Sequence, residues 1–144
     1  MNHPTIFVVD DAKEHRHILT ALLRGHGYQV VEVEDTLDAI VRSYEIMPDL
    51  LVVSFNSADA RTLHGLDRLR SAANLADVPV LGANSAGPLL DRRAAWRLGL
   101  VDCVEKPFNV DYLLDRVTRA LAPREVVAIF EPVPARPMNL ARVA

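Results

Sequence analysis

The sequence contains only one cysteine, Cys103, so no disulfide can form within the chain. It also lacks any long run of basic residues, and its formal net charge of -3 argues against nucleic acid as the main partner. No apolar run approaches the ~20 residues of a membrane-spanning helix, and residues 1–4 do not resemble the start of a signal peptide. We therefore expect a cytoplasmic protein of a reducing compartment that does not enter the membrane.

The 144 residues are enough for one domain with a sizeable core, and half of them are hydrophobic. We expect this domain to occupy residues 1–121. The composition changes over residues 122–144, because this stretch holds four of the nine prolines. It also contains one apolar run, at residues 126–130. The pattern predicts a proline-rich tail with a short strand-like segment, too short for a DNA-binding output domain.

Short apolar runs alternate with stretches of helical spacing along residues 1–121. Five such runs predict strands, at residues 5–9, 28–33, 50–53, 79–83 and 100–104. The run at 50–53 is continuously apolar, as in the middle of a parallel sheet. Five strands alternating with five helices predict an α/β fold: a flavodoxin-like, doubly wound parallel sheet in the order 2-1-3-4-5.

The helices are expected to bury the apolar residues that recur every three or four positions. Asp35 and Asn109 are placed to cap the second and last helices. A fourth helix is expected at about residues 89–98, with Trp96 either on the core or on a partner-binding face. The predicted inner faces are Ile18, Leu19, Leu22 and Leu23; Leu37, Ile40, Val41 and Tyr44; Leu63, Leu66 and Leu69; and Val110, Leu113, Leu114, Val117 and Leu121.

Polar residues follow the predicted strands at the sheet edge where such folds bind ligands. Asp10 and Asp11 follow the first strand, and adjacent carboxylates of this kind suit Mg²⁺. Lys106 follows the last strand and would place a positive charge opposite them. Each signal alone also fits a simpler interpretation: an acid that caps the next helix, or a surface lysine before a proline turn.

Taken together, the apolar runs, the acid pair and the lysine resemble the receiver domains of bacterial response regulators, over roughly residues 4–121. The resemblance implies that an acid pair holds Mg²⁺, that a third aspartate takes a phosphoryl group from a histidine kinase, and that a Ser or Thr and the lysine sense it. It also implies an inward-turning aromatic residue on the last strand and a cis bond before Pro107. The matching stretches are 7–11 with Arg16, 27–32, 48–53, 79–81 and 99–108.

Three positions depart from the receiver pattern while Asp10, Asp11 and Lys106 are kept. Ser54 stands where the family has the phosphoacceptor aspartate. Asn84, followed by Ser85, stands at the Ser/Thr position, and Cys103 stands at the aromatic position. We interpret Cys103 as a small core residue. The segment from Ser54 to Gly65 is also longer than the family pattern.

A serine hydroxyl, unlike a carboxylate, is not ionised at neutral pH and needs a neighbouring base to act as a nucleophile. We therefore expect a stand-alone pseudo-receiver that is not an enzyme and requires no cofactor. It would act through protein–protein contacts with a histidine kinase or a downstream regulator. Mg²⁺ binding by Asp10 and Asp11, with the backbone of Asn56 as a further ligand, is expected to be weakened but not abolished.

Other interpretations stay open. Phosphorylation could survive at Asp59, in the lengthened segment, or at Ser54. A flavodoxin-like ligand-binding domain or enzyme is the remaining alternative, although the sequence has no glycine-rich phosphate loop and no nucleophile elbow. Self-association could use the tail or the face formed by the fourth helix and the last strand.

Overall fold

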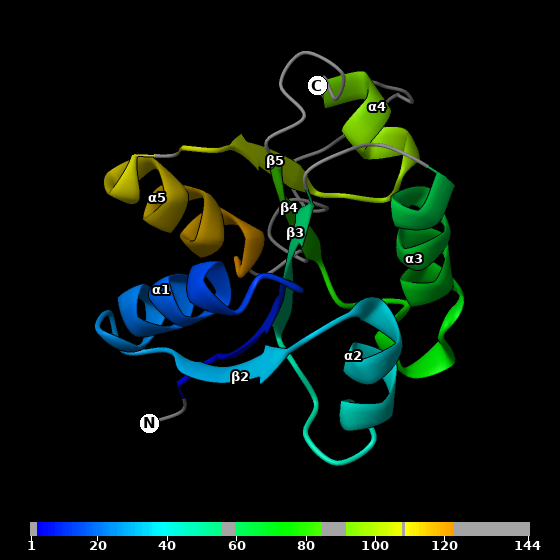
Figure 1. Ribbon diagram of the computed structural model, residues 1–144, viewed down its shortest axis with the longest axis horizontal. Coiled ribbons are helices and arrows are strands. Elements are labelled where there is room, and N and C mark those ends of the chain that lie inside the picture. Colours follow the sequence, from blue (N-terminus) through cyan, green and yellow to red (C-terminus); the bar gives the residue numbers. More distant parts are fainter. Residues whose placement is uncertain (1–2, 56–59, 85–91, 108, 123–144) are drawn as a thin grey trace.

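A parallel five-stranded sheet forms the centre of the protein (Figure 1). The computed structural model describes residues 3–55, 60–84, 92–107 and 109–122. The strand order is β2-β1-β3-β4-β5 and every neighbouring pair is parallel, which confirms the predicted topology. The strands are β1 (Thr5–Val9), β2 (Gln29–Val33), β3 (Leu50–Phe55), β4 (Val80–Asn84) and β5 (Asp102–Glu105).

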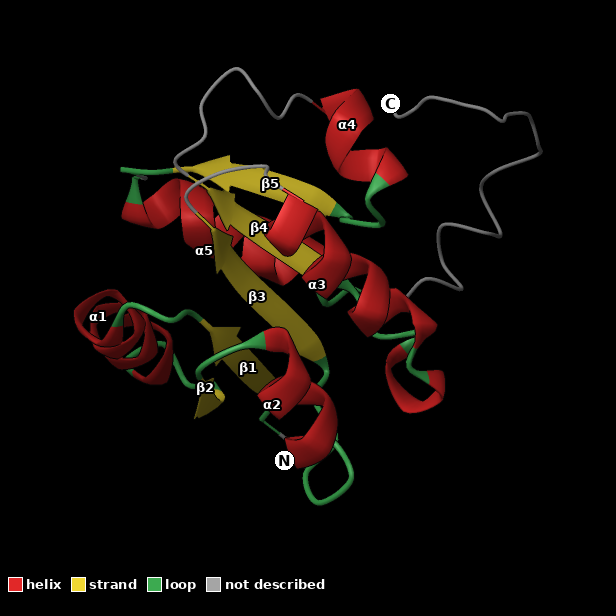
Figure 2. Ribbon diagram, turned by 45° about the vertical axis from the view of Figure 1, so that its right-hand side comes forward, coloured by secondary structure: helices red, strands yellow, loops and turns green. Residues whose placement is uncertain are grey.

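Helices cover both faces of this sheet (Figures 1 and 2). Helices α1 and α5 lie on one side, and α2 and α3 lie on the other. None of the helices in the described segments is long and apolar enough to cross a membrane. The helices are α1 (Lys13–Arg24), α2 (Thr36–Arg42), α3 (Ala60–Ser71), α4 (Arg92–Arg97) and α5 (Val110–Ala120), with a 3-10 turn η1 (Ala73–Leu75) after α3.

Each central strand is buried on both faces, which explains its continuous apolar sequence. Successive residues of β1 and β3 alternate between two core clusters. Phe7 and Leu51 belong to the cluster that includes residues of α2 and α3. Val8 and Val52 belong to the cluster that includes residues of α1 and α5. This alternation fixes which side of the sheet each residue at the strand ends faces.

The predicted helix caps are present. The Asp35 carboxylate accepts a hydrogen bond from the Asp38 backbone N–H at 2.8 Å, and the Asn109 side chain accepts one from Tyr112 at 3.2 Å. The strand limits differ from the prediction by one or two residues. Both Ser54 and Asn84 belong to strands, because β3 and β4 continue to pair through their last residues.

The predicted inner face of α2 is wrong. Leu37 and Val41 are 54% and 58% exposed, and Tyr44, beyond the helix end, is 74% exposed. Of the predicted residues only Ile40 packs partly against the core. Ala39 instead is fully buried. The helix is therefore turned so that a small residue, rather than the large apolar ones, points inward.

Close packing against α3 and η1 accounts for this orientation. A Cβ added at Gly65 of α3 would stand only 2.9 Å from the hydroxyl oxygen of Thr36, so the two helices approach too closely for large side chains. The buried hydroxyl of Ser43 accepts a hydrogen bond from Asn74 Nδ2 at 2.5 Å. Thr36, Ala39 and Ser43 are thus the anchoring face of α2.

Three other predicted inner-face residues need correction, and the position of one undecided residue is now known. Ile18, Leu63 and Val110 are exposed, each at the margin of a helix whose neighbouring leucines or valines fill the core. Trp96 is exposed too, so its side chain does not pack on the core. The described part of the fourth helix is α4, and residues 89–91 lie outside the described residues.

Candidate functional site

Asp10 and Ser54 lie at neighbouring strand ends on the same side of the sheet. The pairing of Val9 with Val53 places the next residues, Asp10 and Ser54, side by side. Side chains alternate between the two faces along a strand, so Asp10 and Ser54 point to the same face as Val8 and Val52. That face is covered by α1 and α5. The predicted convergence of these two positions is therefore present in the geometry.

Asp10 is a buried carboxylate, 5% exposed. One of its oxygens, Oδ1, accepts a hydrogen bond from the backbone N–H of Ala12 at 2.9 Å. The other, Oδ2, is buried without a hydrogen-bond partner in the described part of the chain. The Nζ atom of Lys106 lies 3.9 Å from Oδ2. Lys106 thus brings a positive charge to the acid, as the sequence predicted.

A buried arginine holds the turn that follows β1. The Arg16 guanidinium donates to the backbone oxygen of Asp10 at 2.7 Å and to Glu32 Oε1 at 3.1 Å. His17 Nε2 lies 3.2 Å from the same Glu32 oxygen. The Arg16–Glu32 pair was not predicted from the sequence. The available signal was the position of Arg16, one turn into the helix that follows Asp10. Its partner Glu32 lies on β2, so the contact depends on the register between β1 and β2.

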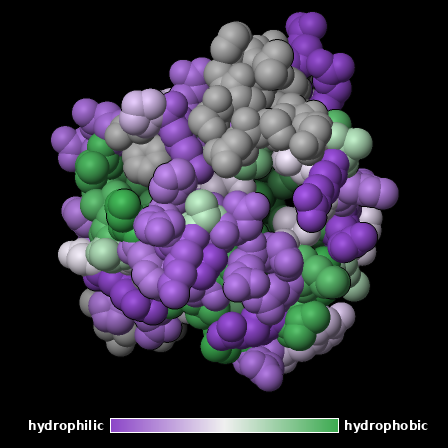
Figure 3. Space-filling model, in the orientation of Figure 1, coloured by the Kyte–Doolittle hydropathy of each residue, from purple (hydrophilic) through white to green (hydrophobic). Residues whose placement is uncertain are grey.

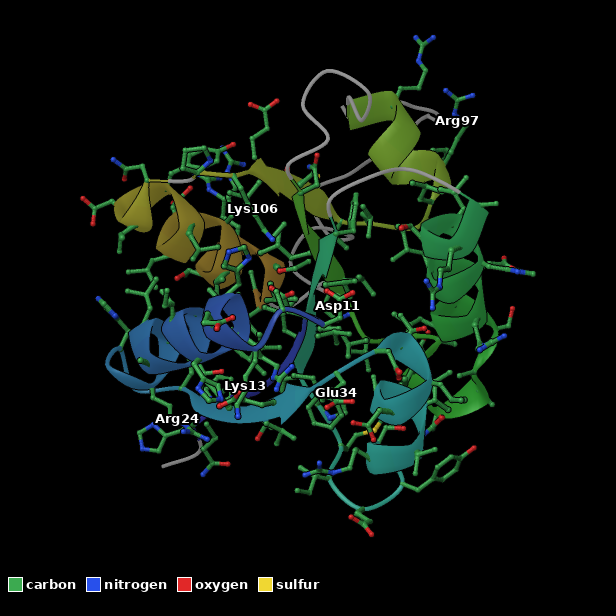
Figure 4. The ribbon with its side chains drawn as sticks, in the orientation of Figure 1. Asp11, Lys13, Arg24, Glu34, Arg97 and Lys106 are labelled. Carbon is green, nitrogen blue, oxygen red and sulfur yellow. The ribbon has the colours of Figure 1, made fainter. Side chains whose placement is uncertain are left out.

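Asp11 is exposed, unlike its neighbour Asp10. Asp11 and Lys106 follow the carboxyl ends of parallel strands, so both lie at that end of the sheet (Figure 4). Glu34, just after β2, is labelled in the same view. An exposed carboxylate beside a buried one leaves room for a hydrated cation.

The hydroxyl of Ser54 is buried and has no hydrogen-bond partner in the described part of the chain. No histidine in these segments donates to or accepts from it; the ring nitrogens of His17 and His26 contact Glu32 and the Leu22 carbonyl instead. None of the described side chains is hydrogen-bonded to this hydroxyl as the general base that a serine nucleophile needs. Its chemistry in this geometry is that of a neutral oxygen ligand or hydrogen-bonding group.

The two unpartnered oxygens, Asp10 Oδ2 and Ser54 Oγ, fit the oxygen preference of Mg²⁺. The described residues contain no cluster of three or more His, Cys, Asp or Glu side chains around a common point. A cation here would accordingly take two carboxylates at most from these segments and would retain water ligands.

Asn84 and Cys103 form a separate pair on the opposite side of the sheet. The Asn84 side-chain amide donates a hydrogen bond to Cys103 Sγ at 2.7 Å. Asn84 is buried, and Cys103 packs against the core cluster that includes Phe55. Burial raises the pKa of the Cys103 thiol to about 11, although the Asn84 donor opposes this shift. Cys103 is therefore a protonated core residue at neutral pH.

Several predicted positions lie outside the described residues: Asn56, Asp59, Ser85 and the apolar run at 126–130. Lys106 and Pro107 are joined by a cis peptide bond, as the resemblance implied. The backbone N–H of Lys106 donates to the Asn84 carbonyl at 2.7 Å, which ties the end of β5 to the end of β4.

Comparison with known proteins agrees with this arrangement. The chain is 30% identical over 129 residues to the phosphate regulon transcriptional regulatory protein PhoB of Klebsiella pneumoniae, covering 88% of this chain and 56% of PhoB. The chain thus spans about half the length of PhoB and of similar curated relatives.

Two solved structures are similar. A response regulator from Chloroflexus aurantiacus has a TM-score of 0.75 at 26% identity, over 85% of this chain and all of that one. The receiver domain of the Pseudomonas aeruginosa sensor histidine kinase PA1611, solved with a magnesium ion in its active-site cleft, has a TM-score of 0.71 at 22% identity. It covers 83% of this chain and 98% of that one, and at this identity the likeness shows the fold alone.

The family model for the response regulator receiver domain matches residues 6–118, which include β1 from its second residue, β2 to β5 in full, and the acid–lysine pair. The fold, the buried Asp10 and the Lys106 at the end of β5 agree with that match. The chain belongs to the response regulator receiver domain family.

Proposed function

We propose that this chain is a pseudo-receiver: a two-component receiver domain that signals by protein contact without an aspartyl phosphorylation cycle. The observation that carries the proposal is Ser54. It occupies the strand end beside Asp10, the family's acceptor position, and its buried hydroxyl engages no base in the described residues.

The loss of charge at Ser54 also bears on metal binding. Mg²⁺ in protein sites relies on one or two carboxylates together with phosphate oxygens. Asp10 and Asp11 remain, but the third carboxylate of the family pattern is replaced by a neutral hydroxyl. We infer weakened Mg²⁺ binding here, in contrast to the PA1611 receiver, whose structure contains the ion. No cofactor is required for the proposed activity.

The Asn84–Cys103 pair supports the loss of phosphate sensing. In the receiver pattern these two positions hold a hydroxyl that senses phosphate and an aromatic residue that turns. Here the amide of Asn84 is bonded to the thiol of Cys103 on the side of the sheet away from Asp10. Cys103 has no ring to reposition, so the pair acts as a fixed contact between β4 and β5.

Receiver domains interact with histidine kinases and downstream effectors, and we propose partners of these kinds for this chain. The proposed receiver domain is residues 1–121, followed by a tail at 122–144. We further propose a stand-alone, cytoplasmic role without enzymatic activity, nucleic-acid binding or membrane contact. The net charge of -3 supports the exclusion of nucleic acid.

Incubation with radiolabelled acetyl phosphate and Mg²⁺ tests the proposal. The expected result is no stable label on the wild-type chain. Label that disappears in Asp59→Ala would establish a substitute aspartyl acceptor and defeat the proposal. Label that disappears in Ser54→Ala would establish a serine acceptor, which is the alternative in which phosphorylation survives at Ser54.

A further inference from the structure

The outer face of α4 carries the only tryptophan of the chain together with two arginines. Arg93 precedes Trp96 by three residues and Arg97 by four, the spacings that bring side chains together on one face of a helix. All three are exposed, Trp96 at 67%. Val101, in the turn that leads to β5, is also exposed, at 42%. Figure 4 shows Arg97 extending outwards from this part of the molecule.

A third arginine reaches the same region from α3. Gly99, in the turn after α4, has a φ of +84°, and a Cβ added there would overlap the Arg70 guanidinium. The backbone N–H of Gly99 donates to the Trp96 carbonyl at 2.9 Å, so the Arg70 charge lies beside the end of α4. We use the name α4 patch for Arg70, Arg93, Trp96, Arg97 and Val101.

The α4 patch is strongly basic although the chain as a whole is acidic. Its three arginines form no ion pair of 4.0 Å or less with any described residue. Asp67, Asp77 and Glu105 of the neighbouring segments are exposed, and Asp102 is held by Arg116 on the other side of the sheet. Figure 3 shows strongly hydrophilic side chains over α4, at the upper right. With six arginines against one acid, α3 and α4 attract an acidic partner.

The sequence after α5 has the matching chemistry. Residues 125–131, which lie outside the described residues, are Glu-Val-Val-Ala-Ile-Phe-Glu, an apolar run with an acid at each end. In an extended conformation side chains alternate between two faces. One face would then present an acid, two apolar side chains and a second acid: Glu125, Val127, Ile129 and Glu131. This order suits a surface on which arginines surround a tryptophan.

A place at the edge of the sheet is unfavourable for residues 125–131. The crossovers through α3 and α4 step outward towards β5 with their helices on one side of the sheet, where Leu98, just after α4, packs with the α2–α3 core cluster. Helix α5 lies on the other side (Figures 1 and 2). A parallel strand beyond β5, reached from α5, would therefore have the opposite handedness, whereas about 98% of such crossovers are right-handed.

The α4 patch is within reach of this segment. Helix α4 leads back to the start of β5, and α5 returns from the end of β5, so the carboxyl ends of both helices lie at the edge of the sheet where β5 begins. The two helix layers are roughly 20 Å apart across the sheet. An extended chain covers about 3.3 Å per residue, so the nine residues from 122 to 131 span about 30 Å.

We propose that residues 125–131 dock on the α4 patch of the same chain, with their apolar side chains over Trp96 and Val101 and their two acids beside the arginines. The short connection to α5 keeps the segment at an effective concentration of roughly millimolar, so a weak contact is enough to hold it. The docked segment closes the α4 patch, and a protein that binds there must displace it. Neither phosphorylation nor a metal ion takes part.

Fluorescence of the full chain tests the contact, because Trp96 is the only tryptophan. Ile129→Asp places a charge on the docking face and is expected to release the segment. The Trp96 emission then shifts to longer wavelength, and its quenching constant with acrylamide rises about twofold or more. Leu140→Asp is the matched control, since it makes the same kind of change in the tail outside residues 125–131 and leaves both readouts unaltered. Circular dichroism verifies that each variant is folded.

A charge reversal distinguishes this contact from general stickiness of the tail. Glu125→Arg combined with Glu131→Arg places like charges on the two surfaces and is expected to expose Trp96. Adding Arg93→Glu and Arg97→Glu to that variant restores opposite charges and recovers most of the shielding. The shielding is also expected to be independent of protein concentration, because the contact lies within one chain.

Three results would each overturn the proposal. The first is a wild-type Trp96 that acrylamide quenches as readily as in Ile129→Asp. The second is a fourfold charge-reversed variant that recovers no shielding. The third is shielding that grows with protein concentration, which would assign the contact to the tail of a second copy.

Discussion

The side-chain amide of Asn84 at the end of β4 donates a hydrogen bond of 2.7 Å to the sulfur of Cys103 on β5. In the receiver pattern the corresponding positions hold a phosphate-sensing hydroxyl and an aromatic residue, whereas here Asn84 and Cys103 are bonded to each other. Asn84 and Cys103 lie on the side of the sheet away from Asp10 and Lys106. The Asn84–Cys103 pair and the acid–lysine pair are therefore on opposite faces.

The buried thiol of Cys103 predicts a pH-dependent contribution to stability. The pKa of Cys103 is raised from 9.0 to about 11, mainly by burial, so the folded state holds its thiol proton more tightly than the unfolded chain. This advantage is complete below pH 9 and is lost as the pH rises from 9 to 11. We expect a loss of about 1–2 kcal/mol that is absent in Cys103→Ala, measured by urea unfolding at pH 8 and pH 11.

The comparison with Cys103→Ala removes the contributions of tyrosines and lysines that titrate in the same range. If the free energy of unfolding falls equally with pH in both proteins, the pKa of the buried thiol is not raised. If it falls more steeply in Cys103→Ala, the sign of the effect is the opposite of the one expected.

Restoring an acid at position 54 should strengthen the metal site. Ser54→Asp adds a carboxylate beside Asp10 and removes an unpartnered hydroxyl, so we expect Mg²⁺ to bind about tenfold or more tightly than in the wild-type chain. NMR titration of the Ala12 amide, which bonds to Asp10, follows the binding. Asp10→Asn in the Ser54→Asp background is the control and should lose the gain; unchanged affinity in Ser54→Asp would contradict the assigned site.

Arg16 should matter more to stability than its neighbour His17, although both contact Glu32. Arg16 is buried and also donates to the Asp10 backbone, whereas His17 is largely exposed. We expect Arg16→Ala to lower the free energy of unfolding by about 2–3 kcal/mol and His17→Ala by less than about 0.5 kcal/mol. Thermal and urea unfolding at neutral pH measure both. Comparable losses in the two variants would show that the surface contact, and not the buried one, holds the turn after β1.

Much of the sheet and the acid–lysine pair could be predicted from the sequence. The apolar runs of β1 and β3 are continuous because both faces are buried, and parallel strands bring their carboxyl ends to one edge. Asp10, Ser54 and Lys106 therefore follow from strand order alone. The caps at Asp35 and Asn109 follow from local chemistry that needs no tertiary information.

The orientation of α2 and the Asn84–Cys103 bond could not be predicted in this way. Helical spacing gives a row of apolar residues but not the side to which it faces, and α2 is turned by the close approach of Gly65 to Thr36. The bond from Asn84 to Cys103 depends on the β4–β5 register, which no short stretch of sequence specifies.

Intact-mass spectrometry after treatment with acetyl phosphate and Mg²⁺ shows directly whether the chain is phosphorylated on an aspartate. Wild-type protein and Ser54→Asp are compared in parallel, because the variant keeps Asp10, Asp11 and Lys106 and regains the acceptor carboxylate. We expect that only Ser54→Asp gains the mass of one phosphoryl group, and that hydroxylamine removes it. A hydroxylamine-sensitive phosphoryl group on the wild-type chain would show an aspartyl acceptor and refute the pseudo-receiver proposal.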